Sequence, residues 1–237
     1  MASVVAICNL ALGHLGDRAT LTSIDPPEGS SQADHCAQFW PLARDEALSA
    51  CDWRFASRTA TLARLDDSLQ DNPTWRYAFA LPADLLVARE LVYSSGFVFA
   101  SENVFLYGSN APRFELGTLD NGTVVLYSNE LLTALRYTRR VTDPTKYTPM
   151  LTTGLSYLMA SFLAGPVLKG KTGAGASAAM RQSWDMYMGK AAMSDANQTR
   201  KTTTFKPSSI RARGYTSGGE TYEDGQYRRE LPYWAQG

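Results

Sequence analysis

The side chains best suited to hold a metal ion in this sequence are two histidines and three cysteines. Cys8, Cys36 and Cys51 form no C-x-x-C pair, and His14 and His35 form no H-x-x-x-H or H-E-x-x-H motif. Cys8, His35 and Cys36 can meet only if the first two predicted helices pack together, and core residues beside one polar histidine explain the same pattern. An odd number of unpaired cysteines is typical of buried, reduced thiols in a protein made in the cytosol. The sequence therefore predicts no metal centre and no cofactor.

Catalysis by a nucleophile or by paired carboxylates is the second chemistry to consider. A catalytic serine or cysteine needs a base beside it, but the chain has no G-x-S-x-G motif and both histidines fall in predicted helices. Paired carboxylates for glycoside cleavage stay open, because the sequence does not tell the distances between them. Asp45-Glu46 is typical of a helix surface, and Asp66-Asp67 of a loop. We expect no catalytic residues, with a glycan hydrolase as the alternative.

The letters G-P-V-L-K-G-K-T at 165–172 match the phosphate-binding pattern G-x-x-x-x-G-K-[ST]. That pattern cradles phosphate only where a strand precedes it, whereas an apolar helical run precedes Gly165. Pro166 would also remove one backbone amide from the phosphate-binding loop. We interpret the segment as a linker between two helices that matches the pattern by coincidence.

The segment 199–237 differs in composition from the rest of the chain. It has almost no aliphatic side chains and cannot bury a core of its own. Because Arg, Tyr and Trp are enriched at protein interfaces, we expect an extended arm that docks on a partner; a disordered end is the alternative. The basic stretch 200–213 also leaves open a nucleic-acid-binding accessory protein. The predicted contact residues of the arm are Arg200, Lys201, Lys206, Arg211, Arg213, Tyr215, Tyr222, Tyr227, Arg228, Arg229, Tyr233 and Trp234.

Helices are expected at both ends of the body of the chain, 1–198. Apolar residues at i, i+3 and i+4 spacing predict four of them. Ser3 is the expected cap of the first and Ser30 or Ser31 of the second, and Pro41 predicts a kink or a break inside the second. Gly165-Pro166 is expected to end the third, and a glycine-rich linker, 170–176, to precede the fourth. The predicted helices cover about 3–15, 31–51, 149–164 and 177–195.

Between the helices lies a predicted β region at about 57–141. Short β-rich segments alternate there with Gly, Asn and Ser punctuation, which is typical of antiparallel strands. The order of helices, strands and helices predicts an α+β fold, in which N-terminal and C-terminal helices pack as a bundle with a central antiparallel sheet or small sandwich. The strand candidates are 57–63, 75–81, 85–93, 97–100, 104–107, 123–127 and 134–141.

Composition excludes several classes of protein. The 237 residues include 44% hydrophobic and 19% charged residues, which excludes a disordered, collagen-like or coiled-coil chain. No apolar run reaches the roughly 20 residues of a membrane helix, and the stretch 4–15 is a poor signal peptide. The formal net charge of zero divides into an arm with seven basic and four acidic residues and a body with 16 basic and 19 acidic residues. Only 6 of the 23 basic residues are lysine, and arginine suits fixed interfaces.

Seven segments in order along the body resemble the tail tubular protein A family of short-tailed, podovirus-type bacteriophages. The resemblance covers nearly all of 1–198, and its specificity comes from the order of the segments more than from any one of them. The segments are A-I-C-N-L-A-L-G-H-L-G-D at 6–17, S-I-D-P-P-E-G-S-S-Q-A at 23–33, F-W-P-L-A-R-D-E-A-L at 39–48, W-R-F-A at 53–56, Y-A-F-A-L-P-A-D-L-L at 77–86, L-R-Y-T-R-R-V-T-D-P-T-K-Y-T-P at 135–149 and S-D-A-N-Q at 194–198.

This resemblance implies a structural virion protein of the tail or neck, assembled in the host cytoplasm, and not an enzyme. Family members are head-to-tail adaptors that form a ring of about twelve subunits under the portal protein. The ring joins the portal to the tail nozzle protein and leaves a channel through which double-stranded DNA passes at ejection. No cofactor, metal, catalytic residue or membrane insertion is implied. A virion-associated glycan hydrolase and a nucleic-acid-binding accessory protein are the alternatives.

Overall fold

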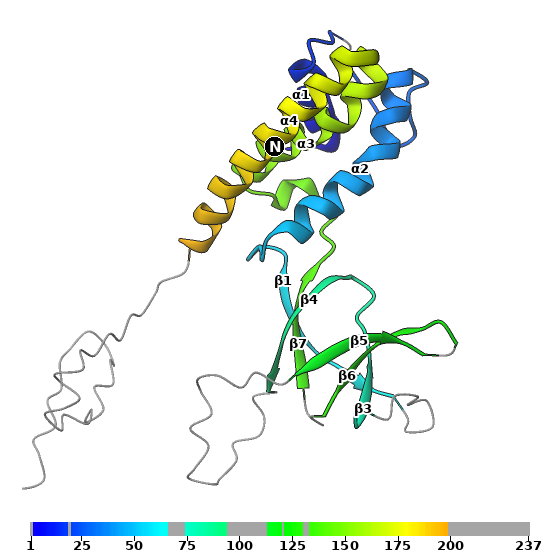
Figure 1. Ribbon diagram of the computed structural model, residues 1–237, viewed down its shortest axis with the longest axis vertical. Coiled ribbons are helices and arrows are strands. Elements are labelled where there is room, and N and C mark those ends of the chain that lie inside the picture. The colour runs from blue at the N-terminus through cyan, green and yellow to red at the C-terminus, as the bar shows by residue number, and fades with distance from the viewer. Residues whose placement is uncertain are drawn as a thin grey trace, which may run out of the picture. The chain divides into compact units, whose positions relative to one another are not determined.

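The computed structural model describes residues 2–18, 20–65, 74–93, 113–119, 121–129 and 133–198 (Figure 1). These residues form helices and antiparallel sheets in the predicted order, so the fold class is α+β. The strand candidates 97–100 and 104–107, and the whole predicted arm 199–237, lie outside the described residues.

The two N-terminal helices begin where the sequence predicts. Helix α1 (Val4–His14) is capped by Ser3, whose hydroxyl accepts a hydrogen bond from the backbone N–H of Ala6, 3.1 Å away. Helix α2 (Ser31–Ala50) is capped in the same way by Ser30. Of the predicted kink or break at Pro41, the break is wrong, because α2 is one continuous helix with Pro41 inside it. Buried side chains before and after Pro41 hold both halves against the same core, which offsets the lost backbone hydrogen bond.

The C-terminal helices form a hairpin whose boundaries differ from the prediction. Helix α3 (Pro149–Leu168) continues past Gly165-Pro166, and α4 (Gly170–Ala196) begins at once, so the predicted linker 170–176 is wrong. Lys169 alone makes the turn, with φ 55° and ψ 162°. Gly173, in the first turn of α4, packs closely against α3. A Cβ at this position would lie 2.8 Å from the carbonyl oxygen of Ala164. Close helix contact, not chain flexibility, accounts for that glycine.

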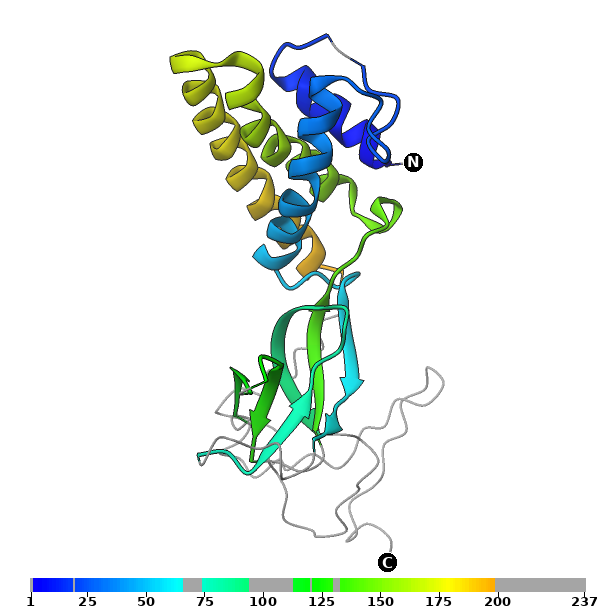
Figure 2. The ribbon, with the colours of Figure 1, turned by 90° about the vertical axis from the view of Figure 1, so that its right-hand side faces the viewer.

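Helix α3 lies between its neighbours and forms the centre of the helical core. It packs on α4, on α1 and on α2, and Figure 2 shows α4 on one side of it and α1 on the other. Among the described residues it is the one helix long and apolar enough to cross a membrane. From the sequence, no apolar run of that length was expected. However, 56% of that apolar window is buried inside the fold. Packing in a core accounts for such a composition.

The β region folds into two antiparallel sheets. The first has the order β1-β7-β4, with β1 (Ser57–Thr61), β7 (Thr133–Arg139) and β4 (Leu85–Tyr93). The second has the order β2-β3-β6-β5, with β2 (Ala63–Arg64), β3 (Tyr77–Ala80), β6 (Val124–Ser128) and β5 (Phe114–Thr118). The predicted strand 57–63 therefore divides at Leu62 and joins both sheets. Strand β5 was not predicted.

Apolar side chains form a helical core and a separate core between the two sheets. Leu91, Leu135 and Tyr137 of the first sheet meet Phe79 and Leu126 of the second. The helical core takes its residues from all four helices and from the segments that flank them, including the fully buried Trp53. Burial on this scale is the main favourable term in folding. The 3-10 turn η2 (Pro144–Lys146) leads from β7 back to α3.

Candidate interaction surfaces

His14 lies beside a serine, which is the geometry that nucleophilic catalysis requires, but the contact is structural. Its Nε2 is 3.0 Å from Oγ of Ser156, and its ring stacks on Tyr157 with centroids 4.1 Å apart. Ser156 is fully buried and donates its hydroxyl proton to the carbonyl oxygen of Thr153. Because the Ser156 hydroxyl proton goes to Thr153, the Ser156 oxygen accepts from His14, and its burial closes it to a substrate. Burial lowers the pKa of His14, which favours the neutral ring.

The cysteines and histidines do not gather into a metal site. Cys8 and Cys36 are in hydrogen-bond contact and fully buried between α1 and α2, and that contact together with burial raises the pKa of the Cys8 thiol. His35 instead stacks on Phe39, with centroids 6.2 Å apart. No group of three or more His, Cys, Asp and Glu side chains in the described ranges is arranged to hold a metal ion. The packing of the first two helices thus brings the two thiols together as core residues.

The P-loop-like letters fall on the α3–α4 hairpin. Gly165 to Leu168 are the last turn of α3, and Gly170 to Thr172 are the first turn of α4. Their backbone amides are therefore not arranged around a phosphate-sized loop. No strand precedes the pattern, which agrees with the expectation of helices on both sides, but the predicted linker is wrong because Lys169 alone connects α3 and α4.

Many of the carboxylates are held by arginines or by hydrogen-bond donors. Asp45 accepts from Arg44 at 2.8 Å and from Arg140 at 3.0 Å, which joins α2 to the segment after β7. Three carboxylates in the described part of the chain have a shifted pKa, and in each it is lowered, mainly by hydrogen bonds: Glu28, Asp84 and Asp143. A general acid for glycoside cleavage needs the opposite shift.

Arginines concentrate where the helices meet the first sheet. Arg89 of β4 donates from Nη2 to the carbonyl oxygens of Cys51, at 2.6 Å, and Ser49, at 3.3 Å, and from Nε to the buried Oγ1 of Thr138, at 2.9 Å. The two carbonyls belong to the C-terminal end of α2, where a positive charge is favourable. We name this contact the Arg89 clamp. It illustrates the fixed, multidentate contacts for which arginine is suited.

Two more arginines complete this junction. Arg136 of β7 pairs with Glu90 at 2.7 Å and with Asp52, and these carboxylates raise its pKa. Arg54 donates its backbone N–H to the buried carboxylate of Asp195, near the end of α4, at 3.0 Å. Both N-terminal and C-terminal helices are therefore tied to the segment that enters β1.

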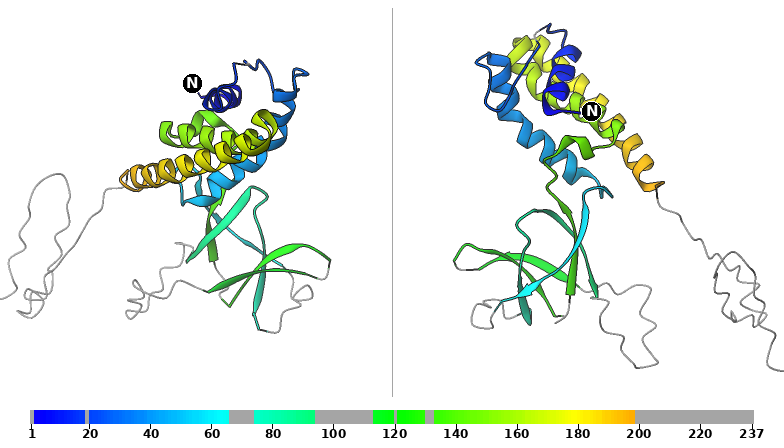
Figure 3. Two further views of the ribbon diagram at one scale, coloured as in Figure 1. Left: turned by 45° about the horizontal axis from the view of Figure 1, so that its top comes forward. Right: turned by 180° about the vertical axis from the view of Figure 1, so that it is seen from behind.

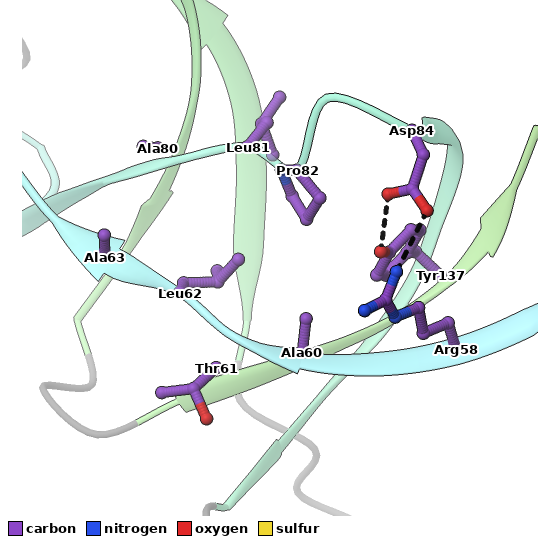
Figure 4. Close-up of a pocket in the computed structure, with 10 residues that line it drawn as sticks. All are labelled: Arg58, Ala60, Thr61, Leu62, Ala63, Ala80, Leu81, Pro82, Asp84 and Tyr137. Atoms are coloured by element: carbon purple, nitrogen blue, oxygen red, sulfur yellow. Dashed lines mark hydrogen bonds and ion pairs between the residues drawn. The ribbon is translucent and has the colours of Figure 1, made fainter.

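A shallow hollow of about 290 Å³ opens beside β1 and β2 (Figure 4). Its walls are mostly small and apolar, with Leu62 and Leu81 among them, and its polar end is closed by three side chains. There Asp84 accepts from the hydroxyl of Tyr137, at 2.7 Å, and from Nη1 of Arg58, at 3.2 Å. The volume lies at the lower end of ligand pockets. Its polar groups Asp84, Tyr137 and Arg58 bind one another.

The outer side of α4 carries a continuous uncharged face. Trp184, Met188 and Ala191 point into the helical core, while positions three and four residues apart on the other side are exposed. Met186 and Met193 on that side expose 53% and 69% of their surface. We name it the α4 outer face: Gly175, Ala179, Gln182, Met186, Gly189, Met193 and Ala196.

A second uncharged face lies on α1. Ala6, Leu10 and Gly13 are exposed at i, i+4 and i+7, and Leu10 exposes 43% of its surface. We name these three residues the α1 outer face. In the views of Figures 2 and 3, α3 separates α1 from α4. The sequence carries the signal for both faces as periodic uncharged positions, but the prediction of the helices considered only their inward sides.

The site residues predicted on the arm, from Arg200 to Trp234, lie outside the described residues. No protein-family model matches the chain, and no curated protein matches it. The resemblance to the tail tubular protein A family therefore rests on the seven sequence segments.

Proposed function

We propose that this protein is a structural component of a bacteriophage virion, a ring-forming head-to-tail adaptor. In this proposal it joins the portal protein to the tail nozzle and lines part of the channel through which the genome leaves. The seven motif segments support the family, and the α+β fold is of the class that the resemblance implies. The protein acts by assembly and not by catalysis.

The observation that carries this proposal is the α4 outer face. A helix of 27 residues that exposes uncharged positions along its length, with two large methionines among them, has more apolar surface than one subunit covers. A ring buries such a face, because each subunit in a closed ring contacts two neighbours. Unlike this exposed face, several side chains capable of chemistry are inaccessible or already paired. Ser156, Cys8 and Cys36 are buried, and Asp45 is held by arginines.

Electrostatics support a role as a conduit. The body of the chain has 16 basic and 19 acidic residues, so a ring of bodies carries a mild negative charge. Like charge between the ring and the DNA phosphates lets the duplex slide without sticking. The arm, with seven basic and four acidic residues, has the composition of a clasp for a neighbour or for the portal.

The deciding experiment is electron microscopy of the purified protein in negative stain, alone and mixed with portal protein. We expect ring-shaped particles, or collars on the portal, with a central channel. Monomers in both samples, shown by light scattering at the same concentrations, would contradict the proposal. A full-length variant with Tyr233 and Trp234 changed to Ser tests the arm, and we expect weaker joining to the portal with an unchanged circular dichroism spectrum.

A further inference from the structure

The two uncharged outer faces lie on different sides of α3. Helix α3 packs on α1 and on α4, and Figure 3 shows the order α1, α3, α4 across the helical layer. A contact between two different faces of identical subunits is heterologous, and repetition of such a contact gives a ring where the rotation between neighbours closes. Two faces on opposite sides of the central helix meet this requirement.

The faces are complementary in size. Along α4 the order is large, small, large, with Met186, Gly189 and Met193. Along α1 the order is small, large, small, with Ala6, Leu10 and Gly13. Each set spans seven residues, or about 10.5 Å of helix at 1.5 Å per residue. Leu10 can therefore enter the gap above Gly189 while the two methionines lie over the small residues of α1, which is the packing of side-chain knobs into holes.

Open space surrounds Gly13 and Gly189, so no packing contact within the subunit requires glycine at either position. A Cβ added at Gly13 or at Gly189 would meet no other atom within 4 Å, whereas one at Gly173 or Gly154 would press on a neighbouring helix. Glycine in a helix costs about 1 kcal/mol relative to alanine. The close approach of a helix from a neighbouring subunit would explain why glycine occupies positions 13 and 189, since the isolated subunit does not require it there.

Charges around the two faces are opposite in sign. Near the α4 outer face, Lys171 and Lys190 are exposed, with Asp185 as the exposed acid. The segment that follows α1, 15–30, carries three acids, Asp17, Asp25 and Glu28, against one base, Arg18. It is tied to α1 by two hydrogen bonds between Asn9 and the backbone of Leu21, at 2.7 and 3.0 Å. A basic α4 side thus fits an acidic α1 side better than it fits a second α4.

We propose that the α4 outer face of one copy packs on the α1 outer face of the next copy. This inference rests on the ring of the proposed function and names the surfaces that build it. Each subunit then covers its methionines with Leu10 of one neighbour and offers its own Leu10 to the other. A contact between two α4 helices, or between two α1 helices, would instead stop at a dimer.

Cysteine cross-linking of the full-length chain tests the pairing. In the double variant Leu10→Cys/Gly189→Cys, the new thiols face each other across the proposed contact, and mild oxidation gives a ladder of multimers on a non-reducing gel. The parent chain is the control, since Cys8 and Cys36 are buried and Cys51 is half-buried. Each single variant gives no ladder. Dimers from Gly189→Cys alone would overturn the inference in favour of an α4–α4 contact.

Charge insertion provides the second test. Met186→Glu abolishes rings and portal collars, while Met150→Glu, at a methionine with 39% exposure on α3, leaves them intact. Circular dichroism and the thermal midpoint show that both variants fold. If the parent chain forms rings but the double cysteine variant gives no ladder, the proposed α4–α1 contact is wrong, while the proposed function as a ring-forming adaptor is retained. If the parent chain forms neither rings nor collars, the proposed function itself fails.

Discussion

The Arg89 clamp makes a quantitative prediction about the junction between α2 and the first sheet. The variant Arg89→Met keeps most of the side-chain length and loses all three hydrogen bonds. A hydrogen bond to a charged group contributes about 1.5–3 kcal/mol when one partner is removed. Water can replace the guanidinium at the half-buried carbonyls of Ser49 and Cys51, but Thr138 is fully buried and loses the donor to its hydroxyl oxygen. We therefore expect the free energy of unfolding to fall by about 2–3 kcal/mol.

Urea unfolding followed by circular dichroism measures this change. With a slope of about 2 kcal/mol per molar urea, the midpoint falls by about 1 M. Arg89→Lys recovers little of the loss, because an ammonium cannot span three acceptors in a fixed plane. The matched control is Arg58→Met, where an arginine with 56% side-chain exposure makes an ion pair with Asp84 and the loss stays below about 0.5 kcal/mol. Equal losses for the two methionine variants would refute the structural role of the clamp.

Three further changes test the helical layer. Gly173→Ala lowers the free energy of unfolding by about 1–2 kcal/mol in urea, because overpacking against a backbone oxygen outweighs the better helix propensity of alanine; an unchanged midpoint would exclude this close contact. Lys169→Gly raises the thermal midpoint, since φ 55° with ψ 162° is a region that glycine adopts without strain, and we expect about 1 kcal/mol; a lower midpoint would contradict the strained turn. The lowered pKa of His14 means that its contribution to stability is present above its unfolded pKa of about 6.5 and is lost as the pH falls through the folded pKa. Thermal midpoints between pH 7 and 5 therefore fall less in His14→Gln than in the parent chain, and equal falls in the two proteins would contradict this role of His14.

Local signals in the sequence predict the elements that depend on local physics. Ser3 and Ser30 cap the helices that follow them, since a cap needs only a hydroxyl and the nearby amides. The strands with alternating or apolar runs, such as β4 and β7, were confirmed within a few residues. The α+β class follows from the order of these elements along the chain.

Predictions that treated glycine and proline as punctuation were wrong where packing decides. Gly165-Pro166 does not end α3, and Gly173 belongs to α4 because it lets the two helices touch. Strand β5 was not predicted, and it contains Gly117, where a Cβ would lie 2.5 Å from the ring of Tyr127. That ring lies on the neighbouring strand β6, and the pairing cannot be seen in the five residues of β5 themselves.

By itself the sequence determined the fold class, the caps, the charge division between body and arm, and the motif order that suggests a phage adaptor. Tertiary structure alone decided that His14 faces a buried serine, that Arg89 holds the end of α2, and that Met186 and Leu10 stay exposed on different sides of α3. The physical reason is that capping and periodicity act over a few neighbouring residues. Exposure depends instead on which distant helix covers which face, and that is decided when the chain packs.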